Sequence, residues 1–178
     1  MKYQEALTQS MEFLARDEKR IFIGYNIRHG SQAYATLKPV QSKCLEMPVA
    51  ENLMVGLAIG MSLEGYKPVI FFERQDFMLN ALDSIVNHLD KFREMSKGGF
   101  NPSVIIRATV GTNKPLDPGM QHTQDYSEQF KAMIRNFPII PLMDSKSILN
   151  QYKKSASLDS PVMFVERRDL YDKDFDVF

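Results

Sequence analysis

Short apolar runs alternate along this chain with longer segments of helical periodicity. Each run has four or five residues, which is too short for a core helix and typical of a strand buried on both faces. The runs occupy residues 21–24, 68–72, 103–106, 139–142 and 162–165. Because such alternation requires crossover connections, it predicts a single doubly wound α/β domain over residues 1–178, with a mainly parallel sheet between helices.

The segments between the runs are expected to be helical. Apolar positions recur at helical spacing, and Gly65 and Gly98-Gly99 provide natural helix ends. The expected helices cover residues 3–16, 51–64, 77–95, 126–135 and 145–156. Two connections contain helix breakers instead: the polar stretch after Gly24, and a long loop at 111–125 that includes two prolines.

In doubly wound sheets, ligands bind beyond the carboxyl ends of the strands. Three segments should meet at that edge: the one leading to Glu51, the one after Phe72, and the long loop that carries His122. Long ordered loops in compact domains are often functional. A site for a small molecule is therefore expected where these segments meet.

Charge balance and cysteine usage limit the classes of partner. Lysine plus arginine and aspartate plus glutamate number 22 each, so no excess charge argues for nucleic acid or a membrane surface. The balanced charge hints instead at a protein partner. The lone Cys44 cannot form an internal disulfide, no apolar stretch reaches the roughly 20 residues that span a bilayer, and the start is too polar for a signal peptide. We expect a cytoplasmic protein.

Glu51 follows Met47-Pro48-Val49-Ala50 and precedes an apolar helix, so it should lie in the first helical turn. A glutamate there interacts favourably with the helix dipole, and by itself the position favours this ordinary role. Gly56 and Gly60 behind it each cost a helix about 1 kcal/mol relative to alanine and need a reason. Spaced four apart, they share a face and allow another helix to approach closely, either within the chain or at a subunit interface.

The spacing of Glu51, Gly56 and Gly60, with an apolar residue after each glycine, resembles the signature of the pyrimidine-binding domain of thiamine-diphosphate enzymes. The whole chain resembles the N-terminal half of the β-subunit of the decarboxylating component of 2-oxo acid dehydrogenases, which is a transketolase-like domain. Matches run in order along nearly the full length and include Asn80-Ala81-Leu82-Asp83, Met95-Ser96-Lys97-Gly98-Gly99, Gln121-His122-Thr123-Gln124 and Ser160-Pro161-Val162.

The resemblance implies a catalytic role for Glu51. In this family a glutamate bonds a ring nitrogen of the cofactor's aminopyrimidine, promotes its imino tautomer and thereby allows the reactive ylid of thiamine diphosphate to form. Phe77 matches the aromatic residue that stacks on the aminopyrimidine. His122 matches a histidine at the substrate end of the site, where it would bind a carboxylate or shuttle a proton.

These residues also have ordinary structural explanations. Phe77 opens an amphipathic helix, where core packing would suffice, and a loop histidine such as His122 commonly bonds a neighbouring carbonyl. Arg107, at the end of a strand, is either an anion contact or a member of a structural ion pair. Asp117, His122 and Asp125 are metal-binding residue types without the spacing of a known site, so no metal site is expected on this chain.

The chain departs from the family at three places. It stops at Phe178, where family β-subunits continue into a C-terminal domain of comparable size, so it is either truncated or a minimal split subunit. Tyr25-Asn26 stands where an acidic pair usually follows the first strand, and Glu73-Arg74-Gln75-Asp76 replaces mostly apolar and small residues. Both changes fall in loops expected to face the cofactor or substrate, so the substrate stays open.

The sequence contains no Gly-Asp-Gly, the motif that holds the diphosphate and Mg²⁺ in this superfamily. The resemblance therefore implies a separate diphosphate-binding subunit that carries the motif and holds Mg²⁺, in an α₂β₂ hetero-oligomer or around a homodimer of this chain. The predicted activity is that of a thiamine-diphosphate-dependent 2-oxo acid dehydrogenase or decarboxylase. Ketol transfer of the transketolase type, a non-catalytic scaffold or regulator, and an unrelated α/β binder stay open as alternatives.

Overall fold

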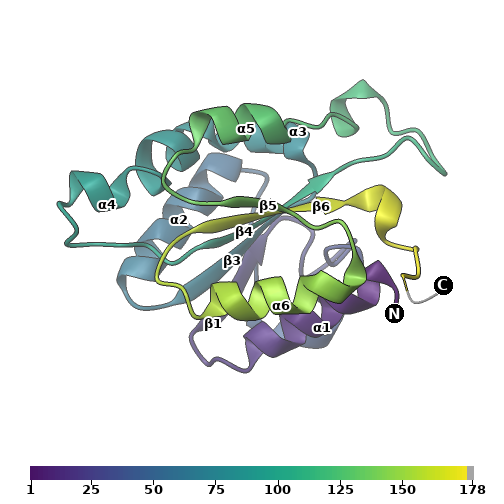
Figure 1. Ribbon diagram of the computed structural model, residues 1–178, viewed down its shortest axis with the longest axis horizontal. Helices are drawn as coiled ribbons and strands as arrows, with labels where there is room; N and C mark the ends of the chain where they lie inside the picture. Colours follow the sequence, from purple (N-terminus) through teal and green to yellow (C-terminus); the bar gives the residue numbers. More distant parts are fainter. Residues whose placement is uncertain (176–178) are drawn as a thin grey trace.

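The computed structural model describes residues 1–175, which form one six-stranded, all-parallel sheet in the order β2-β1-β3-β4-β6-β5 (Figure 1). The strands are β1 (Arg20–Gly24), β2 (Cys44–Glu46), β3 (Lys67–Phe72), β4 (Ile105–Val110), β5 (Ile139–Pro141) and β6 (Val162–Arg167). The predicted fold class, a parallel sheet between helices, is confirmed.

Helices cover both faces of the sheet. They are α1 (Tyr3–Ala15), α2 (Glu51–Leu63), α3 (Gln75–Met78), α4 (Phe92–Met95), α5 (Ser127–Met133) and α6 (Ser145–Ala156). In Figure 1, α1 and α6 lie together below the sheet, whereas α2, α3 and α5 lie above it. Within residues 1–175, no helix has the length and apolar character needed to cross a membrane.

Strand β3 shows why the apolar runs of the sequence are continuous. Val69 and Phe71 belong to the core beneath α1 and α6, whereas Ile70 and Phe72 belong to the core beneath α2 and α3. None of the four is more than 2% exposed. Because successive side chains of a strand point to opposite faces, a strand covered on both sides needs an apolar residue at every position.

The prediction of a single helix at 77–95 is wrong. The segment divides into α3, a 3₁₀ turn at Leu79–Ala81, a π-helical stretch at Asp83–Leu89 and α4. Ser84 is bonded to Asn52 of α2 through both its N–H and its hydroxyl, and the buried Asp90 accepts two backbone N–H groups from residues 135–136. These long-range bonds compete with a regular helical ladder, and periodicity alone does not reveal them.

Strand β2 is absent from the sequence-based expectation. It has three residues, of which only Cys44 is buried, so it lacks the apolar run that marks the other strands. It forms because its backbone pairs in parallel with β1. Strand β4 also differs: it begins at Ile105 instead of Ser103 and continues to Val110.

A left-handed turn interrupts the connection between β1 and β2. Residues 32–35 have φ between 51° and 65°, a conformation that costs a non-glycine residue roughly 1–2 kcal/mol. The turn buries Ala33 completely, and the side chain of Gln4 donates to the carbonyl of Tyr34. The Tyr34 hydroxyl in turn donates to the carbonyl of Glu73 at 3.0 Å. The strained turn thus fixes a tyrosine ring beside the end of β3.

Candidate functional site

The carboxyl ends of β1 and β3 lie side by side, and the chain leaves them toward opposite faces of the sheet. The strands pair in parallel with Gly24 opposite Phe71. After β1 the chain buries Ile27 and Leu37 beneath α1 and α6, whereas after β3 it buries Met78 beneath α2. Such a switch point leaves a crevice in which the ligands of α/β sheets bind.

Glu51 is the first residue of α2, as expected, and its side chain is 9% exposed. The helix N-terminus favours a negative charge there. Its Oε2 accepts one long hydrogen bond, 3.5 Å from Asn80 Nδ2. The ion pairs of residues 1–175 do not include this carboxylate. Most of the acceptor capacity of a buried carboxylate is therefore left for a ligand.

Glu51 and Phe77 line one small pocket at this edge. Tyr25, Met54, Phe71, Phe72 and Glu73 form the rest of its lining. The pocket has a volume of about 20 Å³, which is room for about one water molecule. A heteroaromatic ring bonded to Glu51 would therefore lie over the mouth of the pocket and would need a second wall. Tyr25 and Glu73, two departures from the family pattern, both face this position.

His122 lies beside Phe77 but outside the lining of that pocket. It ends a short turn in the long loop and is half-buried. The centroids of the His122 and Phe77 rings are 5.3 Å apart, and the ring planes are nearly perpendicular at 87°. The hydrogen bonds of residues 1–175 include none from its imidazole, so a bond to a neighbouring carbonyl does not explain this histidine.

Gly111, just after β4, allows the backbone of His122 to approach closely. A Cβ at this position would lie 1.8 Å from the His122 carbonyl oxygen and 3.1 Å from Arg74 Cδ. Any side chain would push the loop away, since real Cβ atoms do not approach backbone so closely. Because Gly111 has no side chain, the turn that ends at His122 and the side chain of Arg74 can both lie against the end of β4.

Asp117 and Asp125 are both bonded to other groups of the chain. Each accepts a hydrogen bond from the backbone N–H two residues further on, and Asp125 also pairs with Arg167 at 3.5 Å. No group of three potential metal ligands forms among residues 1–175. The structure therefore does not assemble Asp117, His122 and Asp125 into a metal site.

Arg107 belongs to a buried ion pair between β4 and β6. Its Nε donates to Glu166 Oε1 at 2.6 Å and its Nη2 to Glu166 Oε2 at 3.1 Å. The hydroxyls of Tyr152 and Tyr171 also donate to Glu166. Burial opposes the charge of Arg107, but Glu166 outweighs it and holds the pKa of Arg107 above its ordinary value. Of the two interpretations of Arg107, the structural ion pair is the one observed.

Gly56 and Gly60 lie on the open face of α2. A Cβ at either position would meet nothing within 4 Å, so packing inside the chain does not explain these glycines. Leu53, which is 54% exposed, and the half-buried Leu57 share their face at helical spacing. The result is an apolar surface, indented at the glycines, that no part of residues 1–175 covers.

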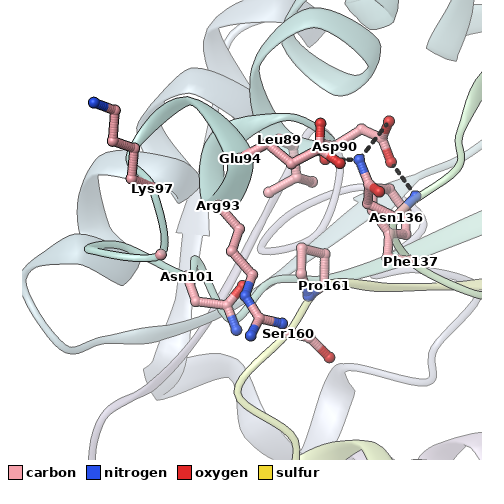
Figure 2. Close-up of a pocket in the computed structure, with 11 residues that line it drawn as sticks. Leu89, Asp90, Arg93, Glu94, Lys97, Asn101, Asn136, Phe137, Ser160 and Pro161 are labelled. Atoms are coloured by element: carbon pink, nitrogen blue, oxygen red, sulfur yellow. Dashed lines mark hydrogen bonds between the residues drawn. The ribbon is translucent and has the colours of Figure 1, made fainter.

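A wider pocket of about 390 Å³ lies at the opposite edge, near the amino-terminal ends of β4 and β6 (Figure 2). Asp90 and Asn136 form one side, bonded to each other, and Arg93 extends along the wall toward Asn101 (Figure 2). None of the predicted site residues lines it. This pocket is therefore separate from the crevice at Glu51.

Sequence reasoning does not identify Asn80 as part of the site. Asn80 follows Phe77 by three residues, and residues at this spacing lie on the same side of a helix. The spacing could therefore have pointed to Asn80. Tyr25, by contrast, is marked in the sequence as a departure from the family pattern in a loop expected to face the cofactor or substrate, and it lines the pocket.

Comparison with known proteins adds to this geometry. Residues 1–173 match the family described as transketolase, pyrimidine binding domain. The mitochondrial pyruvate dehydrogenase E1 component subunit beta of Saccharomyces cerevisiae is 30% identical over 99% of this chain and 49% of its own length. The corresponding subunit of Cyanidium caldarium is 28% identical over 94% of this chain and 52% of its own length. The chain thus spans about half the length of these relatives.

A solved structure has the same fold. It is described as a split gene transketolase, an inactive beta4 tetramer, and it matches with a TM-score of 0.70 at 20% identity, over 93% of this chain and 49% of that chain. At this identity the likeness concerns the fold alone. The family match, by contrast, covers nearly the whole sequence, including Glu51 and the glycine pair. This chain belongs to the transketolase pyrimidine-binding domain family.

Proposed function

We propose that this chain is the pyrimidine-binding subunit of a split thiamine-diphosphate enzyme that acts on a 2-oxo acid. The observation that carries the proposal is the environment of Glu51. Its carboxylate is buried, accepts one long hydrogen bond and lines the same pocket as Phe77. Burying an acid is costly unless it is paired, so its spare acceptor positions favour a ligand. The relatives named as pyruvate dehydrogenase subunits favour a 2-oxo acid as substrate.

The residues of this edge fit the aminopyrimidine of thiamine diphosphate. Glu51 would hold a proton at a ring nitrogen, since a buried carboxylate can share a proton with a basic ring. Phe77 would stack on the ring, and His122 beside it would bind the substrate carboxylate or move a proton. The bound cofactor supplies an electron sink for bond cleavage next to a carbonyl.

The diphosphate end of the cofactor requires a second chain. Gly-Asp-Gly does not occur in this sequence, and the pocket behind Glu51 is too small to enclose a ring. The proposed partner carries the motif, holds Mg²⁺ and supplies the missing wall, in an α₂β₂ assembly. A cytoplasmic location stays a prediction.

The purified chain alone is expected to bind thiamine diphosphate weakly or not at all, because it offers one wall for the pyrimidine and no diphosphate motif. Calorimetric titration with Mg²⁺ present measures this directly. Co-purification with a Gly-Asp-Gly subunit should then restore binding and thiamine-dependent turnover on a panel of 2-oxo acids and ketoses. Tight binding by the chain alone would contradict the split site, and turnover of ketoses only would replace the proposed substrate with ketol transfer.

Replacing Gly56 by leucine is expected to disrupt subunit assembly without harming the isolated fold. A Cβ at this position meets nothing within 4 Å, and replacing glycine by a better helix former stabilises the helix by up to about 1 kcal/mol. At a close helix contact between subunits, however, the same side chain would force the helices apart. Sedimentation of the assembled enzyme and thermal unfolding of the isolated chain measure the two effects. The control is Gln129→Leu, at an exposed position of α5. Unchanged assembly of the Gly56 variant would argue against a subunit interface on this face of α2.

A further inference from the structure

Arg20, the first residue of β1, is buried at the amino-terminal edge of the sheet, far from the crevice at Glu51. Its side chain is 2% exposed and lies on the same face of the sheet as Phe22, beneath α1 and α6. Its Nη1 donates to the carbonyl of Lys67 at 3.1 Å, whereas its buried Nε has no hydrogen-bond partner. Because buried N–H groups are normally bonded, this guanidinium needs an explanation.

The positive charge of Arg20 has no ion-pair partner within residues 1–175. Asp17 lies close to it, but the carboxylate of Asp17 is already bonded to Lys67 at 2.8 Å and to the backbone N–H of Lys19 at 3.0 Å. Burial lowers the pKa of Arg20 to about 10, and the attraction of Asp17 opposes this shift only in part. Burying a charge without a counterion is costly, so an anion beside Arg20 would be favoured.

The other fully buried arginine shows the usual solution. Arg107 is bonded at two nitrogens to Glu166, and this carboxylate holds the pKa of Arg107 above its ordinary value. The two arginines are buried to a similar extent, and their pKa values shift in opposite directions. The chain thus supplies a carboxylate for one buried guanidinium and leaves the other without one.

A pocket of about 350 Å³ lies against Arg20, where β1 and β2 begin. We call it the Arg20 pocket; its lining consists of Glu18, Arg20, Ile21, Ser42, Lys43, Cys44 and Leu45. Its volume falls within the range of small-molecule sites, roughly 300–1,000 Å³. The pocket at Glu51 is lined by Tyr25, which follows the opposite end of β1, so the two pockets are separate.

Lys43 adds a second cation to the Arg20 pocket. Its Nζ donates to the carbonyl of Asp17 at 2.6 Å, and the backbone N–H of Arg20 donates to the same carbonyl at 3.1 Å. Lys43 is half-buried and forms no ion pair in the part of the chain that the structure describes. Glu18 in the same lining is exposed, so water screens its negative charge. The pocket therefore has two partly desolvated cations and one solvated acid.

We propose that the Arg20 pocket binds a phosphate group, either free or as the monoester of a small molecule, through Arg20 and Lys43. A phosphate is favoured over a carboxylate because its charge of about −1.5 to −2 suits two cations. The planar donors of a guanidinium also match its oxygens. The inference stands apart from the proposed function, since it concerns the opposite edge of the sheet.

The first experiment is calorimetric titration of the purified chain with inorganic phosphate, glycerol 3-phosphate and acetate. Both phosphates should bind at one site and acetate more weakly. Because bonds to charged groups are strong, R20M and K43Q should each weaken phosphate binding by about 10-fold or more. Tighter binding of glycerol 3-phosphate than of phosphate identifies a monoester, and equal binding identifies free phosphate. Acetate binding as tight as phosphate binding would overturn the assignment.

The matched control is R16Q. Arg16 is an exposed cation that lines a neighbouring pocket of about 290 Å³ together with Arg20, but it is not part of the Arg20 pocket. R16Q removes the same charge as R20M and should leave phosphate affinity unchanged. If R16Q weakens binding and K43Q does not, the phosphate lies in the neighbouring pocket and the proposal is overturned.

The second experiment is thermal unfolding with and without phosphate. At ten times its Kd, a ligand that binds only the folded chain should raise the Tm by about 3–6 °C. Phosphate also stabilises proteins by exclusion from their surface, and R20M measures that part because it lacks the site. The Tm rise should therefore be larger and saturable in the wild-type chain and in R16Q. Equal rises in the wild-type chain and R20M would refute the site.

NMR keeps the test open if R20M does not fold. The Nε–H resonance of Arg20 should shift when inorganic phosphate is titrated into the wild-type chain, and it should shift equally in R16Q. An Arg20 signal that stays in place at saturating phosphate would overturn the proposal.

Discussion

Replacing Glu51 by glutamine is expected to lower kcat of the assembled enzyme by about 10²–10⁴-fold, which is the usual contribution of a general acid or base. Glutamine keeps the size of the side chain and can still accept a bond from Asn80, but an amide cannot hold a proton at a basic ring nitrogen. The fold should persist, because the helix-dipole interaction lost with the charge contributes only about 0.3–1 kcal/mol.

The matched control for Glu51 lies at the other end of the same helix. Glu64 is the exposed C-cap residue of α2, and Glu64→Gln should leave turnover unchanged. Steady-state kinetics of both variants, with thermal unfolding of each isolated chain, separate catalysis from folding. Near-normal turnover of the Glu51 variant in the assembled enzyme would refute the role proposed for this carboxylate.

Breaking the buried ion pair should have the largest effect on stability. Arg107→Met leaves the carboxylate of Glu166 buried without its cation, and such a break costs about 3–5 kcal/mol. The double variant R107M/E166Q removes both charges, while glutamine can still accept bonds from Tyr152 and Tyr171. It should therefore recover most of the loss. Urea unfolding followed by circular dichroism gives the free energy of unfolding of each variant.

The control for the ion pair is Arg167→Met. Arg167 pairs at the surface with Asp125 at 3.5 Å and Asp169 at 3.3 Å, and exposed pairs contribute about 0–1 kcal/mol. Equal free energies of unfolding for R107M and R167M would show that the buried ion pair contributes no more to stability than the exposed one. A double variant as unstable as R107M would show that the loss comes from packing and not from an unpaired carboxylate.

The sheet could be predicted because its strands are covered on both faces. The five-residue run at 68–72 must be apolar at every position to serve two cores, and this makes the strand visible in the sequence. Strand β2 has one buried residue and no such run. The broken helix after Phe77 depends on two long-range bonds, which Ser84 N–H donates to Asn52 and Arg135 N–H donates to Asp90, so local periodicity could not predict it.

The edge of the sheet that carries the candidate site could be predicted from the sequence, but the contacts of its residues could not. The expectation that Glu51 and the segment after Phe72 meet follows from strand polarity, and the pocket shared by Glu51 and Phe77 agrees with it. The role of Arg107 could not be decided, because its partner lies 59 residues away. The left-handed turn that positions Tyr34 could not be predicted either, since nothing in residues 32–35 signals a positive φ.

Under the proposed function, the small pocket of about 20 Å³ behind Glu51 would make cofactor affinity depend on subunit concentration. A site that is completed by a second chain binds its ligand only while the two chains are associated. By mass action, dilution would therefore release the ligand, and saturating ligand would stabilise the association of the chains. The cell would then control the activity through the amount of either subunit. An excess of this chain alone would be catalytically silent and would not deplete the cofactor pool.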